Sequence, residues 1–93
     1  MTDILKNNPI LKKAIQTWGK QAQLLMVLEE MAELQKEILK NINRHKENGA
    51  ELADETADVL IMLEQLMQIY DMRDAVENRI LHKLEKIKKR VEE

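Results

Sequence analysis

The chain has 93 residues, of which 44% are hydrophobic and 34% are charged. A chain of this length can form one domain with one modest core, and it buries only about 60–65% of its unfolded surface, so we expect self-association. Because the chain contains no cysteine and has a formal net charge of −2, it cannot form disulfides or thiolate metal sites, and its charge gives no reason to expect a nucleic-acid polymer as partner.

The first residues, MTDILKNN, carry an acid and lack the apolar core of a signal peptide. No apolar run of membrane-spanning length follows them. We therefore expect a cytoplasmic protein that does not bind a membrane. Only Trp18 and Tyr70 are aromatic, so aliphatic side chains and methionines must fill the interior, which suits packed helices better than sheets.

Asn8 and Pro9 have the pattern of a helix N-cap followed by proline in the first turn, which predicts a short helix over residues 9–17. Trp18 and Gly19 then end or bend this helix. Residues 20–46 contain no glycine or proline and have apolar residues at three- and four-residue steps, which predicts a long amphipathic helix. Its apolar positions are Leu24, Leu28, Met31, Leu34, Ile38 and Ile42.

Asn48 and Gly49 give a cap or turn signal before a third predicted helix. The apolar positions of that helix are Leu52, Val59, Met62, Leu66 and Ile69. Asp71 is expected to cap a fourth helix. The apolar positions of this last helix are Val76, Ile80, Leu84, Ile87 and Val91.

These elements predict one all-α domain over residues 1–93. Because the connections are short, neighbouring helices are expected to be antiparallel. The predicted fold is a small antiparallel helical bundle, with three main helices plus a short N-terminal helix, and it is completed by oligomerisation.

Two acidic pairs, Glu30-x-x-Glu33 and Glu55-x-x-Asp58, lie within the predicted helices. Residues three apart share a helix face, so two such helices side by side would form a cage of carboxylates. Carboxylate oxygens are the ligands that Mg²⁺ prefers, and Mg²⁺ most often serves phosphate chemistry. The simpler alternative is that these acids face water, since pairs of this spacing also arise by chance.

Glu55 favours the metal site over the solvent-facing alternative. It is the only charged residue on a helix face that is otherwise apolar from Leu52 to Ile69. A carboxylate there is partly desolvated, which is costly unless a cation or a hydrogen-bond donor compensates. Glu30 and Asp58 also border apolar stripes, whereas Glu33 has more polar surroundings.

The sequence lacks the residues that two other kinds of catalytic site require. A di-iron carboxylate bundle needs Glu-x-x-His pairs, and neither His45 nor His82 has a glutamate three residues before it. The chain has no serine or cysteine, and its threonines show no arrangement of base and orienting group. Water activated by a metal is the remaining plausible nucleophile.

The sequence around the acidic pairs resembles a known family. EEMAE at residues 29–33 and ETAD at residues 55–58 are similar to the EExxE…ExxD signature of the MazG-like all-α nucleoside triphosphate pyrophosphohydrolases. The similarity covers most of residues 15–70. It implies a helical dimer or tetramer that uses Mg²⁺, or alternatively Mn²⁺, to hydrolyse an NTP or dNTP to the monophosphate and pyrophosphate. The implied metal ligands are Glu30, Glu33, Glu55 and Asp58.

The last predicted helix carries a basic stripe that includes Lys83, Lys86 and Arg90. These residues could clamp the phosphates of the substrate, and they resemble the family's K-x-x-K-N-x-x-R pattern, with Ile87 in place of the asparagine. The alternative is that they complement the helix macrodipole and increase solubility.

Three further residues are candidates for the site, Glu29 as a catalytic residue and Trp18 and Gln23 as substrate contacts. Glu29 is rotated about 100° from Glu30 around the helix, so it would position water or simply face solvent. Trp18 would stack on a base or cover the core beside Gly19. Gln23 would read a base edge.

Two alternative functions remain open at this point. A phosphoribosyl-ATP pyrophosphatase resembles the same acidic helices and is similarly short. A helical oligomerisation module, whose acidic residues only decorate its surface, would need no catalytic site. The sequence leaves the base and the sugar of the substrate undetermined.

Overall fold

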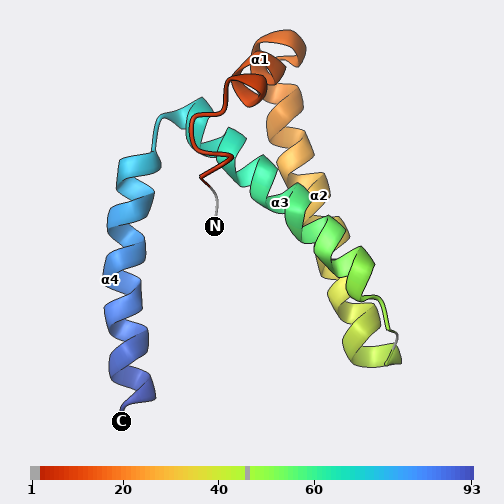
Figure 1. The fold of residues 1–93 in the computed structure, drawn as a ribbon, viewed down its shortest axis with the longest axis vertical. Helices are drawn as coiled ribbons and strands as arrows, with labels where there is room; N and C mark the ends of the chain where they lie inside the picture. The colour runs from red at the N-terminus through yellow and green to blue at the C-terminus, as the bar shows by residue number, and fades with distance from the viewer. Residues whose placement is uncertain (1–2, 46) are drawn as a thin grey trace.

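The computed structural model describes residues 3–45 and 47–93. Four helices follow one another: α1 (Pro9–Trp18), α2 (Lys20–Arg44), α3 (Gly49–Tyr70) and α4 (Arg73–Val91). All regular structure in the described residues is helical, which confirms the predicted all-α class with three main helices and a short N-terminal helix. Figure 1 shows α2 and α3 side by side, with α4 leading away from them. Within these residues, no helix is both long and apolar enough to cross a membrane.

Both ends of α1 are confirmed. The side chain of Asn8 accepts a hydrogen bond from the N–H of Ile10 at 2.9 Å, and Pro9 occupies the first turn. Gly19 separates α1 from α2 with a φ of 93°, a left-handed value that glycine adopts readily. Its N–H donates to the carbonyl of Ile15 at 2.9 Å. The chain therefore closes α1 and turns into α2 at a single residue.

α2 and α3 form an antiparallel pair that is fixed at both ends. At the connecting turn, the buried side chain of Asn48 donates to the carbonyl of Glu37 at 2.9 Å and accepts from the amide of Asn41 at 3.1 Å. At the other end, the ammonium group of Lys20 lies 5.1 Å from the ring centroid of Tyr70, which is a cation–π contact. These contacts fix the register of α2 against α3.

The face of α3 that the sequence predicted to be buried is covered, but so is the rest of the helix from position 58 to position 69, including Glu64 and Gln65. Positions 52, 55, 59, 62, 66 and 69 are all buried or half-buried. Glu55 is half-buried, as expected of a carboxylate on this face.

The buried face of α2 differs from the predicted apolar seam. Its buried residues are Gln23 and Val27. Glu37 and Asn41 lie on this same side of the helix, and their hydrogen bonds to Asn48 set the rotation of α2. Much of the predicted seam is exposed in the single chain: Leu28, Met31, Ile38 and Ile42.

α4 is held by its first turn. Arg73 forms an ion pair with Glu64 of α3, which also accepts from the amide of Gln68 at 3.0 Å and from the N–H of Asn7 at 3.3 Å. Burial by itself would raise the pKa of Glu64, but the hydrogen bonds from Arg73, Gln68 and Asn7 outweigh it and lower the pKa. Glu64 therefore links α3, α4 and the N-terminal segment as a buried carboxylate.

The start and direction of α4 depart from the sequence predictions. Asp71 does not cap α4; it ends α3 with a left-handed φ of 47°, and Met72 occupies the N-cap position of α4. The expectation of antiparallel neighbours is met by α2 and α3, whereas α4 diverges and is exposed beyond Val76 (Figure 1). The left-handed turn at Asp71 and the ion pair of Arg73 set this direction. Lys46, the predicted end of α2, lies outside the described residues.

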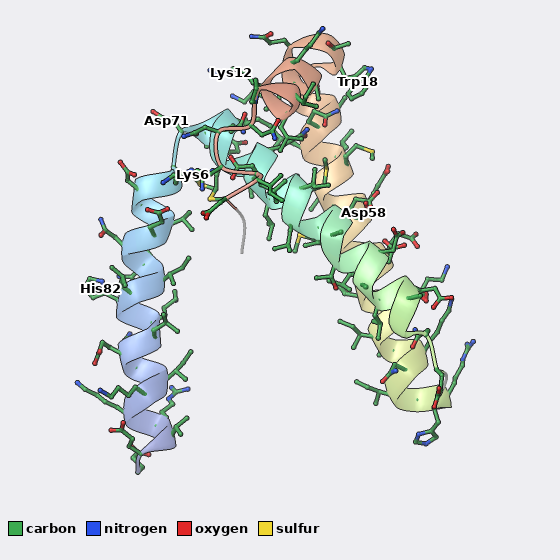
Figure 2. All side chains as sticks on the ribbon, in the orientation of Figure 1. Lys6, Lys12, Trp18, Asp58, Asp71 and His82 are labelled. Atoms are coloured by element: carbon green, nitrogen blue, oxygen red, sulfur yellow. The ribbon has the colours of Figure 1, made fainter. Side chains whose placement is uncertain are left out.

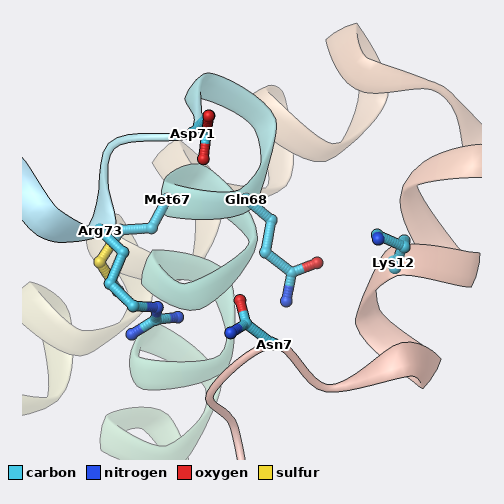
Figure 3. Close-up of a pocket in the computed structure, with 6 residues that line it drawn as sticks. All are labelled: Asn7, Lys12, Met67, Gln68, Asp71 and Arg73. Carbon is cyan, nitrogen blue, oxygen red and sulfur yellow. The ribbon is translucent and has the colours of Figure 1, made fainter.

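A polar pocket of about 200 Å³ lies where α1, α3 and α4 meet (Figure 3). It is lined by Asn7, Lys12, Met67, Gln68, Asp71 and Arg73. Because the side chains of Arg73 and Gln68 both bind Glu64, two polar groups of this pocket attach the start of α4 to α3.

Candidate metal centre

Three of the four predicted metal ligands converge between α2 and α3. Glu30 comes from α2, and Glu55 and Asp58 come from successive turns of α3. One carboxylate oxygen from each residue lies within 4.8 Å of those of the other two, and all three side chains are half-buried. The spacing of each acidic pair places its residues on one helix face, and the antiparallel pairing brings the faces together.

Glu33 lies at the edge of this cluster. It is exposed, and it does not share the close approach of the other three carboxylates. Its charge is nevertheless near enough to raise the pKa of both Glu30 and Glu55. The structure therefore brings together three of the four predicted ligands, with the fourth beside them at the solvent boundary.

The cluster is electrostatically uncompensated. Burial raises the pKa of Glu30 and of Glu55, and the charge of Asp58 raises both further. Within the described part of the chain, the buried Oε2 atom of Glu55 has no hydrogen-bond partner. A buried acceptor without a donor is costly, and three converging carboxylate oxygens are a donor set that hard divalent cations prefer. The residues present therefore fit Mg²⁺ or Mn²⁺.

The raised pKa values predict an unusual pH dependence for the metal-free protein. The ordinary value for these carboxyls is 4.5, and a group whose pKa is higher in the folded state binds protons more tightly there. The ionised form of such a carboxyl group therefore destabilises the folded state. This destabilisation is present above the raised pKa and is lost as the pH falls towards 4.5. We expect the melting temperature, measured by circular dichroism with a chelator, to rise as the pH is lowered from about 7 to about 5.

The variant Glu55→Gln is the control for this pH dependence, because it removes one of the two shifted groups and should flatten the rise. A melting temperature that is constant or falls over the same pH range would contradict the uncompensated cluster.

An apolar groove of about 970 Å³ is lined by residues of α1, α2 and α3, and one of them, Glu29, is next to Glu30 of the cluster in the chain. Three of the predicted substrate or catalytic residues, Trp18, Gln23 and Glu29, line it. Met62 also lines the groove, one helical turn from Asp58. Figure 2 shows Trp18, the last residue of α1, and Asp58 on the same side of the α2–α3 pair. The groove therefore contains an aromatic ring and a buried amide, whereas Glu30, Glu55 and Asp58 are not among its lining residues.

Glu29 lies on the groove side of α2 and is exposed, whereas Glu30 turns towards α3. The structure thus separates these adjacent acids, as the rotation between successive helix positions requires.

The predicted phosphate clamp lies apart from the cluster in the single chain. Lys83, Lys86 and Arg90 line a small hollow of about 250 Å³ on α4, together with Ile87. Since α4 diverges from α2 and α3 (Figure 1), a chain does not bring these residues to its own carboxylates.

Gln65 is a groove residue that the sequence reasoning did not identify. It lines the groove from α3 and is only 2% exposed. The signal was available: position 65 falls on the same stripe as Met62 and Ile69, where a polar residue interrupts apolar ones, as Glu55 does nearer the start of the helix.

The fold and the site together define a small all-α protein with a carboxylate cluster between two antiparallel helices. Comparisons of the chain with protein-family models, with curated proteins and with solved structures find no match. A functional proposal therefore rests on the chemistry of the site.

Proposed function

We propose that this protein is a Mg²⁺-dependent pyrophosphohydrolase that converts a nucleoside triphosphate, NTP or dNTP, to the monophosphate and pyrophosphate. The observation that carries the proposal is the convergence of Glu30, Glu55 and Asp58, with the Oε2 atom of Glu55 buried and unpaired. The resemblance of residues 29–33 and 55–58 to the MazG-like signature supports the same reaction.

In this proposal Glu30, Glu55 and Asp58 hold the cation, and Glu33 joins them from the exposed edge. A bound Mg²⁺ would neutralise phosphate charge and would make water a better nucleophile. Glu29, on the groove side of α2, accepts a hydrogen bond from the attacking water and orients it.

The groove would hold the nucleobase. Trp18 offers a flat face for stacking, and Gln23 offers an amide whose side chain is only 5% exposed. Sugar and phosphates would then extend along the groove towards the carboxylates. In this arrangement the base would lie in the groove and the phosphates would lie at the carboxylates beyond Glu29 and Met62.

The basic residues of α4 would act on a second copy of the chain. Lys83, Lys86 and Arg90 project from a helix that is exposed along most of its length. The exposed apolar side chains of α2 and α4, among them Leu28 and Leu84, would be covered by association into a homodimer or homotetramer. In such an assembly α4 of one subunit can place its cations against the phosphates bound by its partner.

A panel of canonical and modified NTPs and dNTPs, with phosphoribosyl-ATP included, tests the proposed reaction. We expect Mg²⁺-dependent release of pyrophosphate and not of orthophosphate, measured with a coupled assay. We also expect Mg²⁺ alone to raise the melting temperature, because a ligand that binds only the folded state stabilises it. Preferential turnover of phosphoribosyl-ATP would identify the alternative pyrophosphatase.

The exposed apolar faces of α2 and α4 also favour a second candidate, a helical oligomerisation module without catalysis. It predicts self-association, no turnover of any nucleotide and no effect of Mg²⁺ on the melting temperature. The combined turnover and melting measurements therefore separate the two functions.

A further inference from the structure

Gln65 is the most deeply enclosed large side chain of the described residues, and its amide is incompletely paired. The side chain is 2% exposed and lines the apolar groove from α3. Its Oε1 atom is buried and has no hydrogen-bond partner in the part of the chain that the structure describes. Burying an amide oxygen without a donor is unfavourable. A ligand that supplies an N–H group would remove this cost.

The residues around Gln65 restrict the chemical class of ligand that could bind there. Ile61 and Met62 flank it on α3, Trp18 lines the same groove, and Gln23 brings a second buried amide from α2. An apolar groove with an aromatic wall and recessed amides suits a flat heteroaromatic ring that carries hydrogen-bonding groups on its edge. An aliphatic chain would leave the Oε1 atom of Gln65 without a donor.

The distance of Gln65 from the candidate metal centre supports binding of the nucleobase of a substrate beside Gln65. Gln65 and Asp58 are seven residues apart on α3, which is two helical turns, or about 10 Å along the helix axis on the same face. The sugar and the first phosphates of a nucleotide can span this separation. A base at Gln65 would therefore place the phosphates near the carboxylates.

We propose, on the basis of the proposed function, that Gln65 is a specificity-determining residue that pairs with the hydrogen-bonding edge of the substrate's base. The amide Oε1 accepts from an edge N–H group while Nε2–H donates to the neighbouring ring or carbonyl acceptor. The last torsion of a glutamine side chain is soft, so the amide can turn both groups into the groove. The recognised substrates are nucleotides with an unmodified edge, in which an N–H donor stands beside an acceptor.

Trp18 provides a direct measurement of this binding, because it is the only tryptophan of the chain and lines the groove. Nucleoside monophosphates of the common bases are titrated while Trp18 fluorescence is recorded. Each base is compared with its analogue methylated on the edge nitrogen. We expect the wild type to bind at least one parent about 10- to 100-fold more tightly than its methylated analogue, as for a bidentate base contact.

In Gln65→Met the side chain keeps its size and loses both hydrogen-bonding groups. We expect parent and methylated nucleotide to bind this variant with equal affinity, and its melting temperature to be unchanged or higher, since the replaced oxygen has no partner among the described residues. Gln65→Glu keeps the acceptor and loses the donor, and it should retain part of the discrimination. Gln35→Met, which changes an exposed glutamine of α2, should behave as the wild type.

The outcomes separate this inference from the proposed reaction. Discrimination that persists in Gln65→Met, or the absence of any fluorescence response to every nucleotide, overturns the role of Gln65. A lower melting temperature of Gln65→Met with unchanged discrimination assigns the amide a structural role instead. If nucleotides bind with discrimination that depends on Gln65 but no triphosphate is hydrolysed, the base contact stands and the proposed reaction fails.

Discussion

Replacing Glu55 by glutamine should abolish pyrophosphate release while leaving the protein folded. The amide has the shape of the carboxylate but lacks its charge, and one of its two polar atoms becomes a donor that cannot bind a cation. We expect kcat to fall by more than about 100-fold, since loss of even an outer hydrogen-bond partner of a metal ligand commonly costs about 10- to 100-fold. The measurement is steady-state release of pyrophosphate in saturating Mg²⁺.

The same substitution should have the opposite effect on stability without metal. Glu55 is destabilised in the folded state by burial and by the charge of Asp58, so the uncharged variant should melt at a higher temperature in a chelator. Its Mg²⁺-induced rise in melting temperature should disappear. This combination of lost activity and gained metal-free stability is expected of a metal ligand and not of a residue that merely supports the fold.

Glu51→Gln is the matched control, because Glu51 is exposed one turn earlier on α3 and carries the same charge. It should retain activity and the stabilisation by Mg²⁺. Unchanged turnover in Glu55→Gln, or an equal loss in both variants, would refute the proposed metal centre.

Replacing Arg73 by methionine should have the largest effect on the fold. Glu64 would stay buried with only the amide of Gln68 and the N–H of Asn7 as donors. Breaking a buried ion pair from one side leaves an uncompensated charge, so we expect the free energy of unfolding to fall by about 3 kcal/mol. Urea titration at neutral pH, followed by circular dichroism, measures this change.

The loss in Arg73→Met should shrink as the pH is lowered. Burial raises the pKa of Glu64, and without Arg73 fewer hydrogen bonds lower it. The pKa of Glu64 should therefore be higher in this variant, and its carboxyl group should be protonated more readily. Adding Glu64→Gln to Arg73→Met should recover part of the stability at neutral pH. Arg79→Met, an exposed site on the same helix, should change the free energy of unfolding little. An equal effect of the Arg73 and Arg79 substitutions would show that the ion pair does not hold α4.

The helices could be predicted from the sequence because their signals are local. Asn8 with Pro9 starts α1, Gly19 ends it, and the stretch that follows contains no helix breaker before the turn at Asn48. Asp71 was misassigned because an aspartate is suited both to an N-cap and to a left-handed residue at a helix end. Only the backbone shows which of these roles it takes.

The rotation of α2 could not be predicted from its apolar pattern. Hydrophobicity alone would turn the predicted seam towards α3, yet that seam includes Leu28 and Ile42, which are exposed. The hydrogen bonds of Asn41 and Glu37 with Asn48 oppose that rotation. Hydrogen bonds between separate segments of the chain cannot be read from the apolar pattern of one helix. The rotation of α2 was therefore visible only in the structure.

The sequence by itself determined the helical class and the pairing of carboxylates within each helix, because three-residue spacing fixes a shared face whatever the helix packs against. Only the tertiary structure decided that Glu30, Glu55 and Asp58 meet, that Glu33 remains at the edge, and that Gln65 is enclosed in the groove. It also decided that α4 leads away from the site. The reason is physical: these arrangements depend on the register and rotation of helices, which are fixed by contacts between separate segments such as Asn48 with α2 and Arg73 with Glu64.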